Sequence, residues 1–285
     1  MLRPDCCVLF HRMISKKLIL TRRYSLLFVM VALANALQIK PAVQGSRPAV
    51  ATVESASRII PPPSNYRFPN SQTLVYGVEW HLFNAGTTKV RMEPAGQLQK
   101  VTATADSAGM VNVLYSIHDR FEAQFDPHAF CSQRVVKHTE EGPHRRDTQI
   151  QFDYRNHKSL LDEKNIKTGE VKTAVNDIPA CVTDVVTGFY YLASQPLQLG
   201  NTYMFPMNDG GKTTDVIARV ETREQVKVPA GTYQAVRVTA EPQSGALKGK
   251  AKVTVWFSDA QHTPVQMRSK LGWGTLLFRL LRIEK

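Results

Sequence analysis

The sequence predicts an all-β, mainly antiparallel protein: a curved sheet or half-barrel that carries one short helix. Roughly a dozen runs of alternating apolar residues, about 8–15 residues apart, are separated by Gly, Pro, Asn and Asp turns. Helical periodicity is nearly absent outside one segment. Because alternation places every second side chain on the same face, each run fits a strand with one face buried.

Composition excludes several other classes of protein. The chain has 285 residues, of which 43% are hydrophobic and 21% charged, so it is not disordered throughout. Its 16 Gly and 16 Pro residues are scattered, which excludes a collagen-like repeat. A single long apolar run excludes a polytopic helical membrane protein.

An export signal is predicted over residues 1–36, with Met13 as an alternative start. A positively charged segment precedes the apolar stretch 25–33, and Ala-Asn-Ala at 34–36 offers small residues for cleavage after Ala36. The apolar stretch is shorter than the about 20 residues that a membrane-spanning helix needs. An uncleaved membrane anchor is the alternative interpretation.

Loss of this signal changes the charge of the protein. The net charge is +12 for the whole chain, whereas the residues after 36 carry 30 basic and 23 acidic groups, a net charge of +7. No helical stripe of basic residues is present, so no nucleic-acid partner is predicted. The basic excess fits either an ordinary solvated surface or attraction to an anionic envelope surface.

Two cysteines remain after the signal. Cys131 and Cys181 are predicted to form a disulfide, because exported proteins enter an oxidising compartment. The alternative is a pair of buried free thiols. No metal site is predicted, since no second Cys or His lies at ligand spacing from either residue.

The chain divides into a Pro-rich linker over 37–70 and one β domain over 71–285. The first strand has the cleanest alternation, with Tyr76, Val78, Trp80 and Leu82 on one face that must be buried or line a cavity.

A turn is expected at Ala85-Gly86, because small and flexible residues interrupt the alternation there. One helix is expected over 183–195, with Thr183 as its N-cap and Pro196 ending it. We expect this helix to lie over one face of the curved sheet.

The order of several short sequence blocks resembles that of an exported bacterial family, domain of unknown function 3108. The blocks are LVYGVEW at 74–80, NAG at 84–86, DRFE at 119–122, DVVTGFYYL at 184–192, VPAGTY at 228–233 and PVQMRSK at 264–270. The resemblance implies a periplasmic antiparallel β protein of unsettled function, similar in architecture to the curved half-barrels of lipoprotein and lipid carriers. It supplies no catalytic residues.

The sequence contains no recognisable enzyme signature. It lacks a G-x-S-x-G elbow, an H-E-x-x-H motif and the glycine patterns of nucleotide-binding loops. His118, Asp119 and Arg120 form a tight polar triplet, but neighbours in a strand point to opposite faces. We therefore predict a protein that is not an enzyme and has no cofactor, no metal and no catalytic residues.

The expected function is the binding of an apolar or lipid-like ligand on a concave sheet in the periplasm or cell envelope of a bacterium. Tyr76, Val78, Trp80 and Leu82 are the candidate lining residues. One alternative is a structural or assembly factor that binds an envelope protein by its sheet edge. A second alternative is a hydrolase of envelope glycans, which would need paired carboxylates in a cleft.

Overall fold

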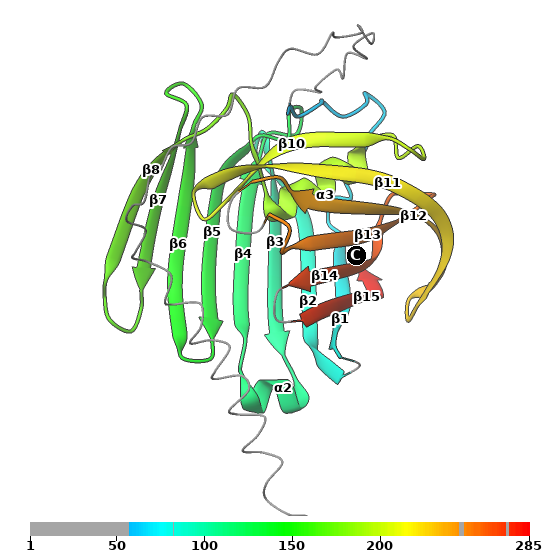
Figure 1. The fold of residues 1–285 in the computed structure, drawn as a ribbon, viewed down its shortest axis with the longest axis horizontal. Coiled ribbons are helices and arrows are strands. Elements are labelled where there is room, and N and C mark those ends of the chain that lie inside the picture. Colours follow the sequence, from blue (N-terminus) through cyan, green and yellow to red (C-terminus); the bar gives the residue numbers. More distant parts are fainter. Residues whose placement is uncertain (1–56, 82, 245–247, 272–273) are drawn as a thin grey trace, which may run out of the picture. The chain divides into compact units, whose positions relative to one another are not determined.

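The structure is a computed structural model that describes residues 57–81, 83–244, 248–271 and 274–285. Its strands form one 15-stranded sheet with the order β8-β7-β6-β5-β4-β3-β2-β1-β15-β14-β13-β12-β11-β10-β9 (Figure 1). The strands are β1 (Thr73–Trp80), β2 (Phe83–Ala95), β3 (Leu98–Ser107), β4 (His118–Phe125), β5 (Ser132–Glu141), β6 (His144–Asp153), β7 (Lys158–Asn165), β8 (Val171–Asp177), β9 (Thr183–Asp184), β10 (Thr202–Asp209), β11 (Lys212–Val228), β12 (Gly231–Pro242), β13 (Lys252–Ser258), β14 (Pro264–Leu271) and β15 (Gly274–Glu284).

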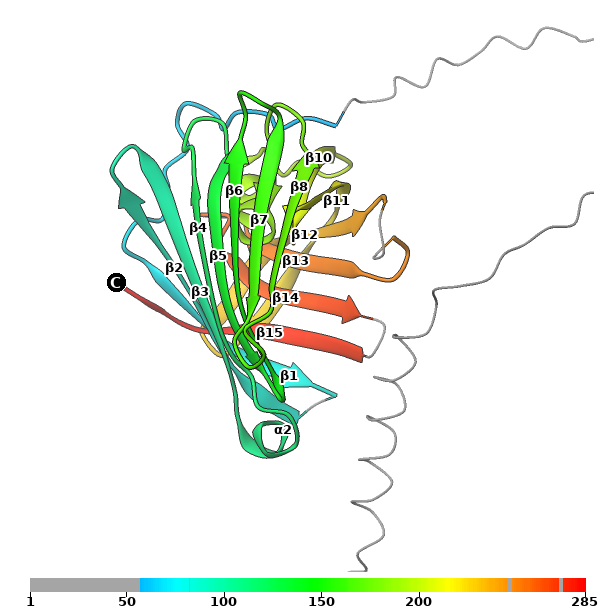
Figure 2. The same cartoon turned by 90° about the vertical axis from the view of Figure 1, so that its left-hand side faces the viewer.

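The predicted fold class is confirmed. Neighbouring strands pair antiparallel, except for the short parallel pair β9–β10. The first strand, β1, pairs with the last strand, β15, so the sheet has a β1–β8 half and a β10–β15 half. Figures 1 and 2 show that the second half folds back and runs across the first, with helix α3 (Val185–Ser194) between them.

The main core fills the space between the two halves of the sheet. Met92, Val101 and Ala123 contribute from the first half, and Val238 and Val255 from the second. These apolar side chains follow the alternation of their strands, as the sequence predicts. Their burial holds the two halves together.

Aromatic rings close the core around α3. The ring of Phe130 stacks on Phe125 at 5.4 Å between centroids and meets Tyr191 edge-on at 5.9 Å. Tyr191 in turn lies 4.8 Å from Phe205 on β10. Because edge-on and offset ring pairs add to the energy of burial, this chain of rings fixes the helix between the sheet halves.

The predicted helix is present, but its predicted N-cap is wrong. α3 begins at Val185, and the carboxylate of Asp184 accepts hydrogen bonds from the backbone N–H groups of Val186 and Thr187, both at 2.9 Å. Thr183 lies in β9 instead. An aspartate one residue later caps two backbone donors at once.

The expected turn at Ala85-Gly86 is also wrong. Both residues lie inside β2, and the register with β1 shifts between Val78 and Glu79. At Gly86, where φ is +150°, a Cβ atom would come within 2.0 Å of the carbonyl oxygen of Asp106. The glycine therefore serves a close approach between strands rather than a turn.

A second helix was not expected from the sequence. α2 (Gly109–Leu114) connects β3 to β4, and none of its residues is buried. Within the part of the chain that the structure describes, no helix is long and apolar enough to cross a membrane. The predicted export signal and Leu82 lie outside the described residues.

Candidate functional site

The predicted disulfide between Cys131 and Cys181 is confirmed. The two Sγ atoms are 2.06 Å apart and the Cα atoms 5.1 Å apart. Cys131 directly precedes β5, and Cys181 lies just before β9 and the start of α3. The bond therefore ties the first half of the sheet to the segment that positions the helix.

A groove lies where three parts of the chain meet. Residues 63–72, the C-terminal end of α3 and the β13–β14 loop surround a space of about 550 Å³. Tyr66, Phe68, Leu74 and Tyr190 provide its aromatic and aliphatic wall. This volume falls within the range of about 300–1,000 Å³ that is typical of small-molecule sites.

The N-terminal wall of the groove is held by ring contacts with the core. Phe68 lies 5.0 Å from Tyr66, 5.9 Å from Phe125 and 5.5 Å from Phe130. Burial raises the pKa of Tyr66 and of Tyr190, so both phenols stay neutral at physiological pH.

Sequence reasoning missed this wall, because the prolines of 37–70 indicated a linker. Two aromatic residues inside a Pro-rich segment were the available signal.

The polar groups of the groove include basic side chains but no carboxylate. Arg67 is exposed, donates to the backbone oxygens of Ser64 and Tyr66, and forms no ion pair within the described residues. His262 Nδ1 lies 2.7 Å from the carbonyl oxygen of Ala193, so this nitrogen carries hydrogen. No Asp or Glu is among the described lining residues. The groove is therefore suited to an apolar group with an anionic end.

The candidate face of β1 is buried at one end and half-buried at the other. Tyr76 packs in a second core cluster with Leu74 and Leu280, and its hydroxyl donates to the carbonyl oxygen of Pro264 at 2.7 Å. Val78 is buried, whereas Trp80 is half-buried and lies 5.0 Å from the ring of His81. The structure thus places Leu74 in the groove, and Tyr76 inside packed core.

The polar triplet on β4 is divided between the two faces of the sheet. His118 pairs with Asp106 at 3.0 Å, while Asp119 accepts a hydrogen bond from the N–H group of Glu140. Burial, with the neighbouring carboxylate of Glu141, raises the pKa of Asp119 to about 6. The triplet therefore forms no hydrolytic unit.

Asp119→Asn is expected to stabilise the protein above pH 6 only. A carboxyl whose folded pKa exceeds its unfolded value binds its proton more tightly when folded, so its cost to stability is present above about pH 6 and disappears as the pH falls toward 4. Since Asp119 is half exposed, we expect a gain in Tm of only about 2–4 °C at pH 8. Thermal unfolding from pH 4 to 8 measures it. The control is exposed Asp162→Asn; an equal gain at pH 4 would contradict the prediction.

One edge of the sheet has no neighbouring strand among the described residues. β8 is the terminal strand. At its two ends, hydrogen bonds run from Asn165 N–H to Glu170 O and from Ile178 N–H to His157 O, so Glu170 and every second residue after it turn their backbone groups toward β7. Alternation then directs the backbone groups of Val171 and Val175 outward. Both side chains are exposed.

A family model described as a protein of unknown function, DUF3108, matches residues 75–281. The chain belongs to the DUF3108 family. This confirms the resemblance predicted from the sequence. A search of curated proteins finds no match to this DUF3108 member.

One solved structure supports the fold of this DUF3108 protein. A β-barrel-like protein of the DUF1849 family from Brucella abortus superimposes with a TM-score of 0.55 at 10% identity, covering 80% of this chain and 98% of the other. A protein with a YmcC-like fold from Bacteroides fragilis gives a TM-score of 0.32 at 9% identity, covering 77% of this chain and 98% of the other. The first similarity supports the β architecture, and at these identities neither indicates an activity.

Proposed function

We propose that this DUF3108 protein is an exported envelope protein that binds a lipid-like molecule with an anionic end, such as a fatty acid, and is not an enzyme. The groove beside α3 carries the proposal, because it combines aromatic walls with basic side chains and contains no carboxylate among its described lining residues. The sequence supports export through its predicted signal.

The wall and the mouth of the groove fit different parts of such a molecule. Tyr66 and Phe68 are only half-buried and offer apolar surface, whose burial against an acyl chain contributes about 25 cal/mol per Å². Arg67 keeps guanidinium donors that no side-chain carboxylate occupies in the described structure. A planar guanidinium matches a carboxylate through two parallel hydrogen bonds.

The structure favours the groove as the ligand site, rather than the whole β1 face that the sequence indicated. Tyr76 is enclosed by core residues, so a ligand would have to displace packed side chains there. Trp80, at the half-buried end of β1, is the second place where a ligand could lie.

The groove does not favour a glycan hydrolase. The two carboxyls of a glycosidase stand about 5–9.5 Å apart, on either side of the sugar bond. No Asp or Glu is among the described lining residues of the groove.

Binding of the fluorescent fatty acid cis-parinaric acid tests the proposal. Arg67→Glu is expected to weaken binding about tenfold or more, and Ala260→Trp, which places an indole in the groove, is expected to abolish it. Arg155→Glu, an exposed residue on the β6–β7 turn, is the matched control and should leave binding unchanged. If Trp80→Ala weakens binding and the groove variants do not, the ligand lies on β1 and the groove assignment is wrong.

The free edge of β8 favours a second candidate, an assembly factor that binds a protein strand. Val171 and Val175 present outward-facing backbone groups and exposed apolar side chains, the features that strand addition uses. Wild-type protein that binds no fatty-acid probe would favour this candidate over the carrier.

A further inference from the structure

We propose that one rim of the protein docks onto an anionic lipid bilayer. The docking rim has an apolar end, formed by Phe83, Met110, Val113 and Leu114, and a basic end, formed by Lys248, Lys250 and Lys270. The inference does not depend on whether the groove binds a ligand.

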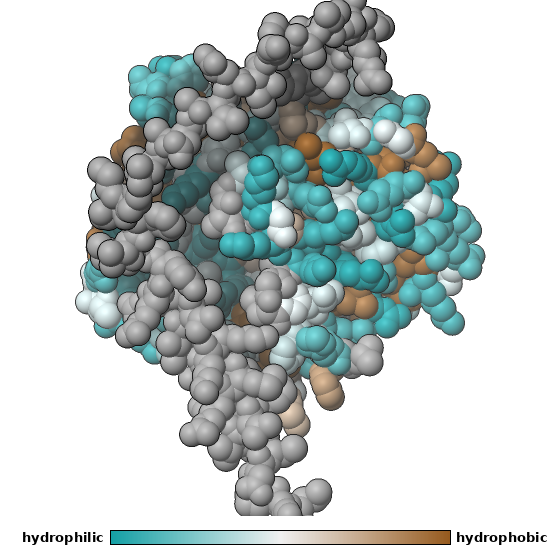
Figure 3. Space-filling model, viewed as in Figure 1, coloured by the Kyte–Doolittle hydropathy of each residue, from teal (hydrophilic) through white to brown (hydrophobic). Residues whose placement is uncertain are grey.

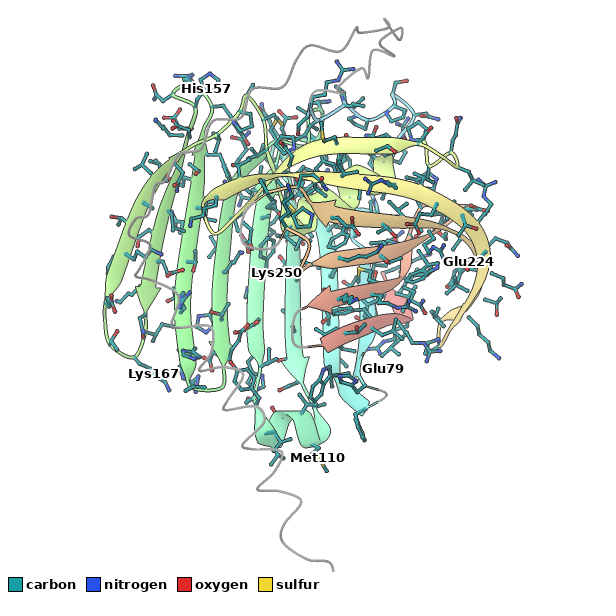
Figure 4. The ribbon with its side chains drawn as sticks, in the orientation of Figure 1. Glu79, Met110, His157, Lys167, Glu224 and Lys250 are labelled. Carbon is teal, nitrogen blue, oxygen red and sulfur yellow. A yellow bond between two sulfur atoms is a disulfide. The ribbon has the colours of Figure 1, made fainter. Side chains whose placement is uncertain are left out.

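The apolar end is exposed to an unusual degree. Met110, Val113 and Phe83 are 75%, 83% and 67% exposed, and no residue of α2 is buried. Large apolar side chains cost free energy in water, so several together on one protrusion indicate a contact with another apolar phase. Figure 4 shows Met110 at the lower tip of the protein, where Figure 3 shows apolar side chains projecting below a largely hydrophilic surface.

Strand pairing makes the two ends of the rim continuous. The N–H of Ala108, just before α2, donates to the carbonyl oxygen of Ala85 on β2, at 2.9 Å. Trp80 pairs with Leu276 on β15, and Lys270 on β14 pairs with Lys252 on β13. Figure 2 shows the start of β13, the end of β14, the start of β15, the end of β1 and α2 following one another along one side.

Basic side chains predominate along the segments of this side. The sequence contains no Asp or Glu in 80–88, 108–117, 243–252 or 268–276, and the described residues of these four segments lie at the rim. Lys248, Lys250 and Lys270 are exposed and have no ion-pair partner among the described residues.

Some acidic side chains on adjoining strands have basic partners, whereas Asp119 and Glu141, near Tyr115 at the end of α2, form no ion pair among the described residues. Glu79 pairs with Arg279 and Glu241 with Lys252, each at 3.2 Å. Asp106, at the β3 end beside α2, lies 3.0 Å from His118.

An anionic bilayer is the occupant that complements both ends. Apolar side chains on a short amphipathic element insert into the headgroup boundary of a membrane. Each lysine close to an anionic surface adds about 1 kcal/mol, which corresponds to about fivefold in binding. An apolar protein groove would match the tip alone, whereas anionic headgroups also account for the unpaired lysines.

Flotation of the full exported protein with vesicles tests the inference. We expect binding to vesicles of phosphatidylglycerol and phosphatidylethanolamine, and much weaker binding to phosphatidylcholine vesicles, which also report any contribution of the N-terminal segment. Met110→Asp with Val113→Asp should lower binding at least tenfold, because the apolar insertion is lost. Lys248→Glu with Lys250→Glu should do the same and remove the salt dependence.

Matched controls change the same residue types elsewhere. Leu199→Asp alters an apolar residue that is 54% exposed in the loop after α3, and Lys167→Glu alters an exposed lysine in the β7–β8 turn. Both should bind vesicles like wild type. Equal binding to both kinds of vesicle, unchanged binding of the α2 variant, or equal losses in the controls would overturn the inference. Rim variants should keep wild-type binding of cis-parinaric acid, so failure here is distinct from failure of the groove proposal.

Discussion

Replacing both Cys131 and Cys181 by Ser is expected to lower the free energy of unfolding by about 4 kcal/mol. The disulfide closes a loop with a sequence separation of 50 residues, and in the chain-entropy model this restricts the unfolded chain by that amount. For a domain of this size the change corresponds to a fall in Tm of about 8–16 °C.

The position of the disulfide adds a structural consequence. Ser132, next to Cys131, donates its N–H to the carbonyl oxygen of Val182 and its hydroxyl to Asp184, so the bond lies beside the contacts that anchor α3. We therefore expect the Ser variant to lose packing around α3 first, seen as faster hydrogen exchange there.

Unfolding with and without a reductant provides the control for the disulfide. Dithiothreitol should lower the Tm of the wild type to that of the double Ser variant, and should leave the variant unchanged. Two free thiols in titration of the native exported protein would contradict the assignment.

The sequence predicts most strands because the alternation of apolar and polar residues indicates both where a strand lies and which of its side chains are buried. β6 alternates cleanly, and its apolar residues Ile150 and Phe152 enter the main core, whereas β1 is buried on both faces where it begins, with Val75 buried beside Leu74. The curvature of the sheet follows less directly, because it depends on irregularities such as the register shift between Val220 and Thr222 on β11.

The candidate site was only partly predictable, because contacts between distant segments create it. Pro69 and its neighbouring prolines indicated an extended segment, yet Tyr66 and Phe68 in that segment pack on Phe130, more than 60 positions away. Local patterns contain no information on which aromatic ring an extended segment will meet. Gly86 shows the same difficulty, since only the position of Asp106 on the next strand explains it.

The disulfide, by contrast, could be predicted from the oxidising compartment and from the number of cysteines that remain after the signal. Once the predicted signal removes Cys6 and Cys7, a single pair of thiols is left, and no knowledge of the fold is needed to join them.

Asp184→Ala is expected to lower the free energy of unfolding by about 3–5 kcal/mol, since it removes a buried acceptor with four donors. Asp184 is 1% exposed. Its Oδ1 accepts from the N–H groups of Val186 and Thr187 at 2.9 Å, and its Oδ2 accepts from the hydroxyls of Ser132 at 2.7 Å and Thr187 at 2.5 Å. Each donor left without a partner in the core costs about 1–3 kcal/mol, and part of this is relieved by local movement.

Asp153→Ala is the matched control for this change. Asp153 accepts backbone hydrogen bonds from Arg155 and Asn156, both at 3.1 Å, the same i+2 and i+3 pattern as at Asp184, but in an exposed turn. Water replaces Asp153 there, so we expect a loss of less than about 1 kcal/mol. Urea unfolding of both variants measures the difference. Equal small losses would show that Asp184 acts only as an ordinary helix cap, worth about 1 kcal/mol.

A double-mutant cycle separates the cap from the link to β5. Ser132→Ala removes a hydroxyl that makes two bonds with Asp184. This hydroxyl donates to the carboxylate of Asp184 and accepts from the N–H of Asp184 at 2.8 Å. If the carboxylate joins the helix start to the sheet, the two single variants together should lose about 1–2 kcal/mol more free energy of unfolding than the double variant loses. Strict additivity would mean that the hydrogen bonds between Ser132 and Asp184 do not couple the helix start to β5. Because Tyr190 on α3 forms part of the groove, a coupled loss should also weaken binding of cis-parinaric acid before the protein unfolds.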